Sequence, residues 1–72
     1  MRSHRILVVD DDPGVRNALA RFLRGKGFEV VEAGGVLEAE GVASSTGPDL
    51  AIVDQRLPDG TGIDLLPRLR AV

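Results

Sequence analysis

The sequence contains no cysteine, and its longest uninterrupted apolar runs are only four residues long. The absence of cysteine excludes disulfides and thiolate metal sites, and it fits a cytoplasmic protein. A helix that crosses a bilayer needs about 20 apolar residues. The N-terminus also lacks the apolar segment of a signal peptide. We therefore expect a cytoplasmic protein with no membrane partner.

The chain also lacks any clustering of charge by sign. Nine basic and eleven acidic residues are interspersed and give a net charge of −2. A nucleic-acid binding surface would gather Lys and Arg on one face, so we expect no direct nucleic-acid contact from this segment. A chain of 72 residues holds one domain at most, and the core of so small a domain is only marginally stable.

Two apolar runs each end in aspartate. Residues 6–9 (Ile-Leu-Val-Val) lead into Asp10 and Asp11, and residues 50–53 (Leu-Ala-Ile-Val) lead into Asp54. Continuous apolar runs of this length are typical of parallel strands that are buried on both faces. Ligands of α/β sheets bind outside the carboxyl ends of the strands. If the two strands are neighbours, the sequence predicts one acidic pocket at that edge of the sheet.

An acidic pocket of this kind favours a divalent cation. Crowded carboxylates repel one another, and a hard cation with oxygen ligands removes that conflict. Mg²⁺ suits the site because it takes one or two carboxylates, keeps several waters and accepts a phosphoryl oxygen. A carboxylate beside bound Mg²⁺ can attack phosphorus and form an acyl phosphate. Acids at strand ends also serve as helix caps, and this alternative applies best to Asp12.

The helix that follows the first acidic cluster is the clearest in the sequence. Asp12 is a suitable N-cap, and Pro13 fits the first helical position. We expect the helix to end between Arg24 and Lys26, where basic side chains complement the helix dipole. One stripe of apolar residues should face the core, and the polar residues should face water. The apolar positions are Val15, Ala18, Leu19, Phe22 and Leu23, and the polar positions are Arg16, Asn17, Arg21 and Arg24.

Strands and helices alternate along the chain. We expect strands at residues 5–10, 28–32 and 49–53, of which the second is more polar, as an edge strand is. A weaker helix is expected at residues 36–43, where Gly41 costs about 1 kcal/mol relative to alanine. Such alternation predicts a parallel sheet with right-handed crossovers. Helices on opposite faces then give the strand order 2-1-3, which makes the two acid-tipped strands neighbours.

A loop and a third helix complete the pattern. Residues 55–60 are expected to form a loop, with turn chemistry at Asp59. Thr61 has the position of an N-cap, with Asp64 as its capping-box partner. Pro67 removes a backbone donor in the second turn, so we expect a kink or fraying there. The apolar positions of this helix are Ile63, Leu65, Leu66 and Leu69.

Two motifs resemble the receiver domain of response regulators in two-component signalling. Residues 8–13 (Val-Val-Asp-Asp-Asp-Pro), together with Arg16, are similar to the start of that family. Residues 54–66 are similar to its phosphoacceptor strand end, the following loop and the third helix. The resemblance covers nearly the whole chain. It implies an α/β, flavodoxin-like, doubly wound parallel sheet, here of about three strands and three helices.

The resemblance also implies site residues, a cofactor and a partner. Asp54 resembles the acceptor that takes a phosphoryl group from a sensor histidine kinase or a histidine phosphotransfer protein. Asp11 resembles a direct ligand of Mg²⁺, Asp10 a ligand through water, and the main-chain carbonyl of Arg56 the third protein ligand. A module of this kind is a signalling phosphoacceptor and not an enzyme, because its only reaction is phosphotransfer to itself.

The sequence departs from the family in its extent. Receivers have five strands, with a switch Ser or Thr after the fourth and a functional Lys after the fifth, whereas this sequence ends within the predicted third helix. Its one lysine, Lys26, is expected at the opposite end of the sheet from the pocket and cannot replace the functional Lys. We therefore expect phosphotransfer to be impaired in this chain. We therefore expect residues 1–72 to be a partial receiver domain, whether a designed piece, a fragment or a truncated gene product. The third strand would then be an exposed apolar edge through which the chain self-associates.

Two other classes of function compete with this interpretation. A receiver-like module could serve interaction or dimerisation without phosphorylation, which would need no modification of Asp54. A phosphatase of the haloacid-dehalogenase type also uses a strand-end aspartate and Mg²⁺, but its second aspartate follows more closely than Asp59 follows Asp54.

His4, the one histidine, could be imagined as a phosphodonor, although an exposed imidazole beside a strand start is more often inert.

Overall fold

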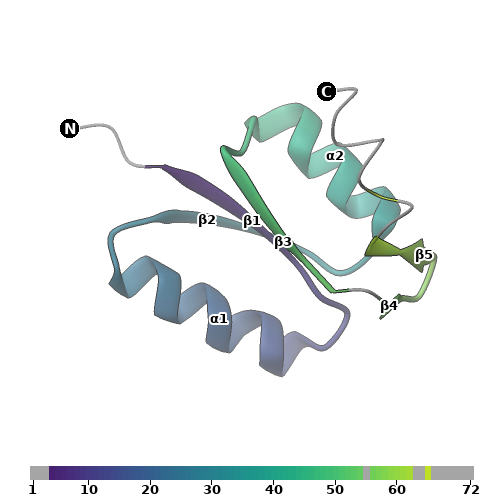
Figure 1. Ribbon diagram of the computed structural model, residues 1–72, viewed down its shortest axis with the longest axis horizontal. Coiled ribbons are helices and arrows are strands. Elements are labelled where there is room, and N and C mark those ends of the chain that lie inside the picture. Colours follow the sequence, from purple (N-terminus) through teal and green to yellow (C-terminus); the bar gives the residue numbers. More distant parts are fainter. Residues whose placement is uncertain (1–3, 55, 63–64, 66–72) are drawn as a thin grey trace.

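The computed structural model describes residues 4–54, 56–62 and 65. Strands and helices alternate in the described part, as the hydrophobic pattern predicts, and a short hairpin follows the third strand (Figure 1). None of the helices in these residues has the length and apolar character that a bilayer crossing requires. The elements are β1 (Arg5–Val9), α1 (Pro13–Gly25), β2 (Glu29–Ala33), α2 (Val36–Thr46), β3 (Leu50–Val53), β4 (Arg56–Leu57) and β5 (Gly60–Thr61).

The three long strands form a parallel sheet in the order β2-β1-β3, which confirms the predicted topology. The register aligns Arg5 with Glu29 on one side of β1 and Ile6 with Leu50 on the other. Helix α1 covers one face of the sheet and α2 covers the opposite face (Figure 1). The central strand is therefore buried on both sides, and the ends of β1 and β3 lie at the same edge.

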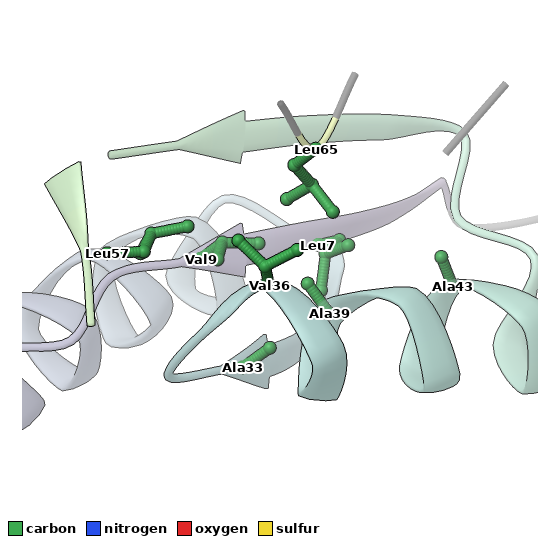
Figure 2. Packing of buried hydrophobic residues seen from close by; sticks show 8 residues of the cluster. All are labelled: Leu7, Val9, Ala33, Val36, Ala39, Ala43, Leu57 and Leu65. Carbon is green, nitrogen blue, oxygen red and sulfur yellow. The ribbon is translucent and has the colours of Figure 1, made fainter. Parts of the chain in front are cut away.

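The sheet separates two apolar clusters. Ile6 and Val8 of β1 pack with Ala20 of α1, whereas Leu7 and Val9 point to the opposite face. This alternation follows from the two-residue period of a strand. The cluster on the α2 side is the larger and includes residues from the segment after β3 (Figure 2). Its buried members are Leu7, Val9, Ala33, Val36, Ala39, Ala43, Leu57 and Leu65.

Helix α1 begins as predicted but presents a different face to the sheet. The Asp12 carboxylate accepts hydrogen bonds from the backbone N–H groups of Gly14 (2.9 Å) and Val15 (3.3 Å), so its role as N-cap is confirmed. The predicted apolar stripe is wrong in part, because Val15 and Phe22 are 52% and 60% exposed, and Ala18 is exposed as well.

The face that packs on the sheet is built on Leu19, Ala20 and Leu23. Arg16 lies on this face too, since residues three and four positions apart share one side of a helix. Its guanidinium bonds to Glu32 and to the Asp10 carbonyl at the end of the sheet. With Arg16 on the packed face, Val15 and Phe22 turn outward. The prediction that Arg16 faces water is therefore wrong.

Helix α2 is longer than predicted. It continues beyond residue 43 to Thr46, where Gly47 closes it in the left-handed conformation, with φ of 60°. The Gly47 N–H donates to the Ala43 carbonyl at 3.0 Å, and the Thr46 hydroxyl donates to the Val42 carbonyl at 2.6 Å. These bonds satisfy carbonyls that a helix end would otherwise leave free.

Replacing Gly41 by alanine is expected to stabilise the chain. Gly41 lies exposed inside α2, and a Cβ added there meets nothing within 4 Å. The free energy of unfolding should rise by about 0.5–1 kcal/mol, because alanine loses less backbone entropy in a helix. Urea denaturation measures the change. Gly47→Ala is the control and should destabilise, because its φ is positive. No gain from Gly41→Ala would contradict the expectation.

A short hairpin occupies part of the predicted loop at residues 55–60. Arg56 pairs with Thr61 and Leu57 with Gly60 in antiparallel register, around a turn at Pro58 and Asp59. Burial of Leu57 in the larger cluster fixes the hairpin against the sheet.

The third helix is only partly described. Gly62 and Leu65 are helical, and Thr61 immediately before them ends β5. The predicted cap partner Asp64 and the predicted kink at Pro67 lie outside the described residues.

Candidate metal centre

The ends of β1 and β3 bring the predicted acidic residues to one edge of the sheet. Val9 and Val53 are register partners on the neighbouring strands β1 and β3. Asp10 and Asp54 are the next residues after them, so they lie side by side at the carboxyl ends of these strands. The Asp54 N–H donates to the Val9 carbonyl at 2.8 Å, and the Asp10 N–H donates to the Ala33 carbonyl at 3.1 Å. The backbone of both residues is therefore held by the sheet.

Three carboxylates gather at this edge. Asp10, Asp11 and Asp54 each offer a carboxylate oxygen, and these oxygens lie within 4.8 Å of one another. Asp10 and Asp54 are half-buried, whereas Asp11 is exposed. Oxygens of opposite ligands around Mg²⁺ are about 4.2 Å apart, so small side-chain rotations suffice for one ion to contact more than one of them. An all-oxygen donor set suits a hard cation.

The Asp10 segment is fixed by two further bonds. Its Oδ1 accepts the Asp12 N–H at 2.9 Å, and its carbonyl accepts a hydrogen bond from Arg16 Nη1 at 2.9 Å. The Arg16 side chain is mostly buried, and its Nε lies 3.3 Å from Glu32 Oε1. Arg16 thus ties the turn after β1 to β2. Its helical spacing with Leu19 and Leu23 was the signal in the sequence that could have placed it on the packed face.

Arg56 lies beside Asp54 through its backbone. Its N–H is 3.5 Å from Asp54 Oδ1, at the limit of a hydrogen bond, and its side chain is exposed at the start of β4. The geometry brings the main chain of Arg56 to the acidic cluster. The role of its carbonyl as a metal ligand stays a prediction.

Comparison with known protein families matches residues 6–72 to the response regulator receiver domain. The chain belongs to this family. The same residues carry the acidic cluster and the strand order described above, so the receiver motifs seen in the sequence are confirmed as marks of the family.

Individual relatives of this receiver support the assignment. It is 42% identical over 65 residues to the photosynthetic apparatus regulatory protein RegA of Rhodovulum sulfidophilum, covering 90% of this chain and 36% of RegA. It is 31% identical over 72 residues to sporulation initiation phosphotransferase F of Bacillus subtilis, covering 100% and 58%. The non-phosphorylated receiver domain of HemR from Leptospira biflexa superposes with a TM-score of 0.87 at 36% identity, covering 96% and 56%.

The receiver chain spans between about a third and three fifths of the length of these relatives. The fold and the family follow from the match. The activity and the partners of a whole protein of this family are therefore proposals for this chain.

The two remaining candidates for chemistry lie away from the acidic cluster of this receiver. His4 is exposed and its Nδ1 lies 3.7 Å from Asp49 Oδ2, at the start of β3 and not at its carboxyl end. Lys26 follows the C-terminal end of α1, where its Nζ lies 5.3 Å from the centroid of the Phe22 ring. The predicted placement of Lys26 at the far end of the sheet is correct.

Asp59 has a contact that the sequence did not indicate. Its carboxylate accepts hydrogen bonds from the backbone N–H groups of Val36 and Leu37 at the start of α2. The residue before that helix is Gly35, which has no side chain to cap it. A helix start without a capping side chain was the one signal that an acceptor had to come from elsewhere.

Proposed function

We propose that this chain is a phosphoacceptor module in which Asp54 takes a phosphoryl group from a phosphohistidine. The observation that carries the proposal is the group of three carboxylate oxygens within 4.8 Å at the ends of β1 and β3. Membership of the receiver family supports it. The donor would be a sensor histidine kinase or a histidine phosphotransfer protein, in the cytoplasm, and residues 1–72 would form a partial receiver domain.

The transfer needs a nucleophile and a way to balance charge. A carboxylate oxygen of Asp54 attacks phosphorus, the new O–P bond forms, and the N–P bond to the donor imidazole breaks and leaves its electron pair on nitrogen. Asp10, Asp11, Asp54 and the Arg56 carbonyl would hold Mg²⁺. When bound, Mg²⁺ neutralises the charge of the transferring phosphoryl oxygens. The chain is itself modified in this reaction, so it acts as a signalling acceptor and not as an enzyme with turnover.

The same geometry bears on two other functions. Leu50 and Ile52 of β3 are exposed, and no strand of the described residues pairs with the outer edge of β3. This favours a second candidate, self-association as an interaction module, and we propose that the chain self-associates whether or not it is phosphorylated. A phosphatase of the haloacid-dehalogenase type would use Asp59 near the nucleophile, but the carboxylate of Asp59 is bonded to α2. That contact disfavours the phosphatase.

Mg²⁺ binding provides the first test. We expect weak binding by the 72-residue chain and a loss of roughly tenfold or more in affinity for Asp11→Ala, because even groups that only support a ligand cost a metal site about that much. Titration with Mg²⁺ monitored by amide chemical shifts measures the affinity. The control is Asp49→Ala, which removes a carboxylate at the opposite end of β3. This variant should bind Mg²⁺ with the affinity of the unsubstituted chain. Full-strength binding by Asp11→Ala would place the ion elsewhere.

A further inference from the structure

The N-terminus of α2 is capped by a residue from a distant part of the chain. Asp59 Oδ1 accepts the Val36 N–H at 2.6 Å, and Asp59 Oδ2 accepts the Leu37 N–H at 3.0 Å, across 23 and 22 residues of sequence. Hydrogen bonds to a carboxylate are about twice as strong as neutral ones, and a negative charge at a helix N-terminus is favourable. Both oxygens of Asp59 are therefore engaged in holding α2.

Gly35 shows how closely the two segments approach. A Cβ at this position would lie 2.8 Å from Asp59 Oδ1, which is closer than real Cβ contacts. The φ of Gly35 is −168°, an extended conformation that any residue adopts. The backbone therefore does not require glycine at this position. Glycine is required because the Asp59 carboxylate occupies the space that a side chain at this position would need.

The same hairpin reaches the acidic cluster at its other end. Asp59 lies in its turn, Leu57 is buried in the larger apolar cluster, and the Arg56 N–H points to Asp54 Oδ1. β4 and β5 hold two residues each, and a hairpin this short is not stable by itself. Its position therefore depends on its anchors, and the described residues include two of them: Leu57 in the larger apolar cluster and Asp59 on α2.

We propose that Asp59 is a positioning residue for the acceptor site: by capping α2, its carboxylate fixes the β4–β5 hairpin and so holds the main chain of Arg56 beside Asp54. This inference rests on the proposed function, in which Asp54 and Arg56 serve the metal and the phosphoryl group. Asp59 itself touches neither. It acts through the hairpin, and its loss should loosen the site while the acidic residues stay in place.

Asp59→Ala tests the positioning role directly. The Mg²⁺ dissociation constant should rise roughly tenfold, the lower end of what loss of a supporting group costs a metal site, and labelling by acetyl phosphate should slow in parallel. Asp59→Asn should recover part of the affinity, because the amide keeps one acceptor oxygen. Asp49→Ala is the matched control, since it also removes a carboxylate that accepts a backbone N–H, that of Arg5. It should behave like the parent chain.

Gly35→Ala disturbs the same contact without removing the charge. Its methyl group should push the Asp59 carboxylate away and weaken Mg²⁺ binding as Asp59→Ala does. Gly41→Ala, in open space on the same helix, should leave the affinity unchanged. The double variant Gly35→Ala/Asp59→Ala should bind no more weakly than Asp59→Ala alone, because both changes break one contact. Circular dichroism confirms that each variant is folded.

The readouts separate this inference from the proposed function. Hydrogen exchange of the Val36 and Leu37 amides should speed up in Asp59→Ala and Gly35→Ala, and this measurement needs neither metal nor phosphate. Faster exchange with weaker Mg²⁺ binding supports the proposal. Faster exchange with unchanged Mg²⁺ binding overturns the positioning role and leaves the proposed function standing. Unchanged exchange overturns the cap itself. A parent chain that binds no Mg²⁺ overturns the proposed function, and the positioning role with it.

Discussion

Asp54→Asn is expected to abolish uptake of a phosphoryl group, both from a cognate histidine kinase and from a small acyl-phosphate donor. The amide has nearly the shape of the carboxylate, so the fold should persist, but it carries no anionic oxygen to attack phosphorus. Labelling should fall below detection. Radiolabelled donor followed by gel electrophoresis measures it, with circular dichroism as the check on folding.

Two controls make this result specific to Asp54. Asp49→Asn removes a charge from the other end of β3 and should label at the parent rate. The label on the parent chain should be released by hydroxylamine, which cleaves acyl phosphates and leaves phosphate esters of Ser and Thr intact. Unchanged labelling of Asp54→Asn, or a label that resists hydroxylamine, would assign the acceptor to another residue.

Self-association of the 72-residue chain is the second large expected effect. The two edges of the sheet differ in how they are protected. At the β2 edge, Arg24 Nη2 donates to the Val30 carbonyl at 3.1 Å and lies 3.5 Å from Glu32 Oε2, so a charged side chain covers the edge. Within residues 4–54, 56–62 and 65, no strand pairs with the outer edge of β3.

The β3 edge also carries apolar surface. Leu50 and Ile52 are 56% and 38% exposed, and their register partners on β1, Ile6 and Val8, belong to the cluster on the α1 side. Pairing of two β3 strands about a two-fold axis perpendicular to the sheet would extend the ladder and place these side chains of both copies on one face. We therefore expect a dimer at micromolar concentration.

Leu50→Lys should shift the chain to monomer, because an edge lysine is a common protection against strand pairing. Leu37→Lys is the matched control: Leu37 is 68% exposed on α2, away from the edge, and its substitution should leave the dimer intact. Light scattering after size exclusion reports the mass. A monomeric parent chain, or a dimer unaffected by Leu50→Lys, would contradict the expectation.

The strands and the acidic cluster were predictable because their signals are local. Four consecutive apolar residues identify β1 and β3, and the aspartates follow each run directly, so the topology alone brings Asp10 and Asp54 together. The cap at Asp12 was equally local. These features need only neighbouring residues and the rule that crossovers are right-handed.

The misses in α1, in the hairpin and at the cap of α2 involve partners from other elements, whereas the late end of α2 rests on bonds between residues four positions apart. The packed face of α1 depends on Arg16 meeting Asp10 and Glu32, and periodicity alone favoured the larger apolar side chains at Val15 and Phe22. The hairpin depends on the burial of Leu57 in a cluster built from other parts of the chain, among them β1, β2 and α2. The cap supplied by Asp59 joins residues more than 20 positions apart, which no pattern of neighbours reveals.

The long connection to β3 has a consequence for how the chain folds. The two pairings of β1 differ in the length of chain between the partners. β2 pairs with β1 after a single helix, with Arg5 opposite Glu29. The contacts between β3 and β1 join residues such as Arg5 and Asp49, which are 44 positions apart. Closing the longer loop costs more chain entropy and tends to come late. Asp54 follows β3, so the complete carboxylate group exists only once β3 has paired with β1. A ligand that binds only the chain with β3 paired to β1 stabilises that state by about 2.7 kcal/mol when the ligand concentration is 100 times its dissociation constant. By this linkage, Mg²⁺ bound at the proposed site would raise the share of the population that has its third strand docked.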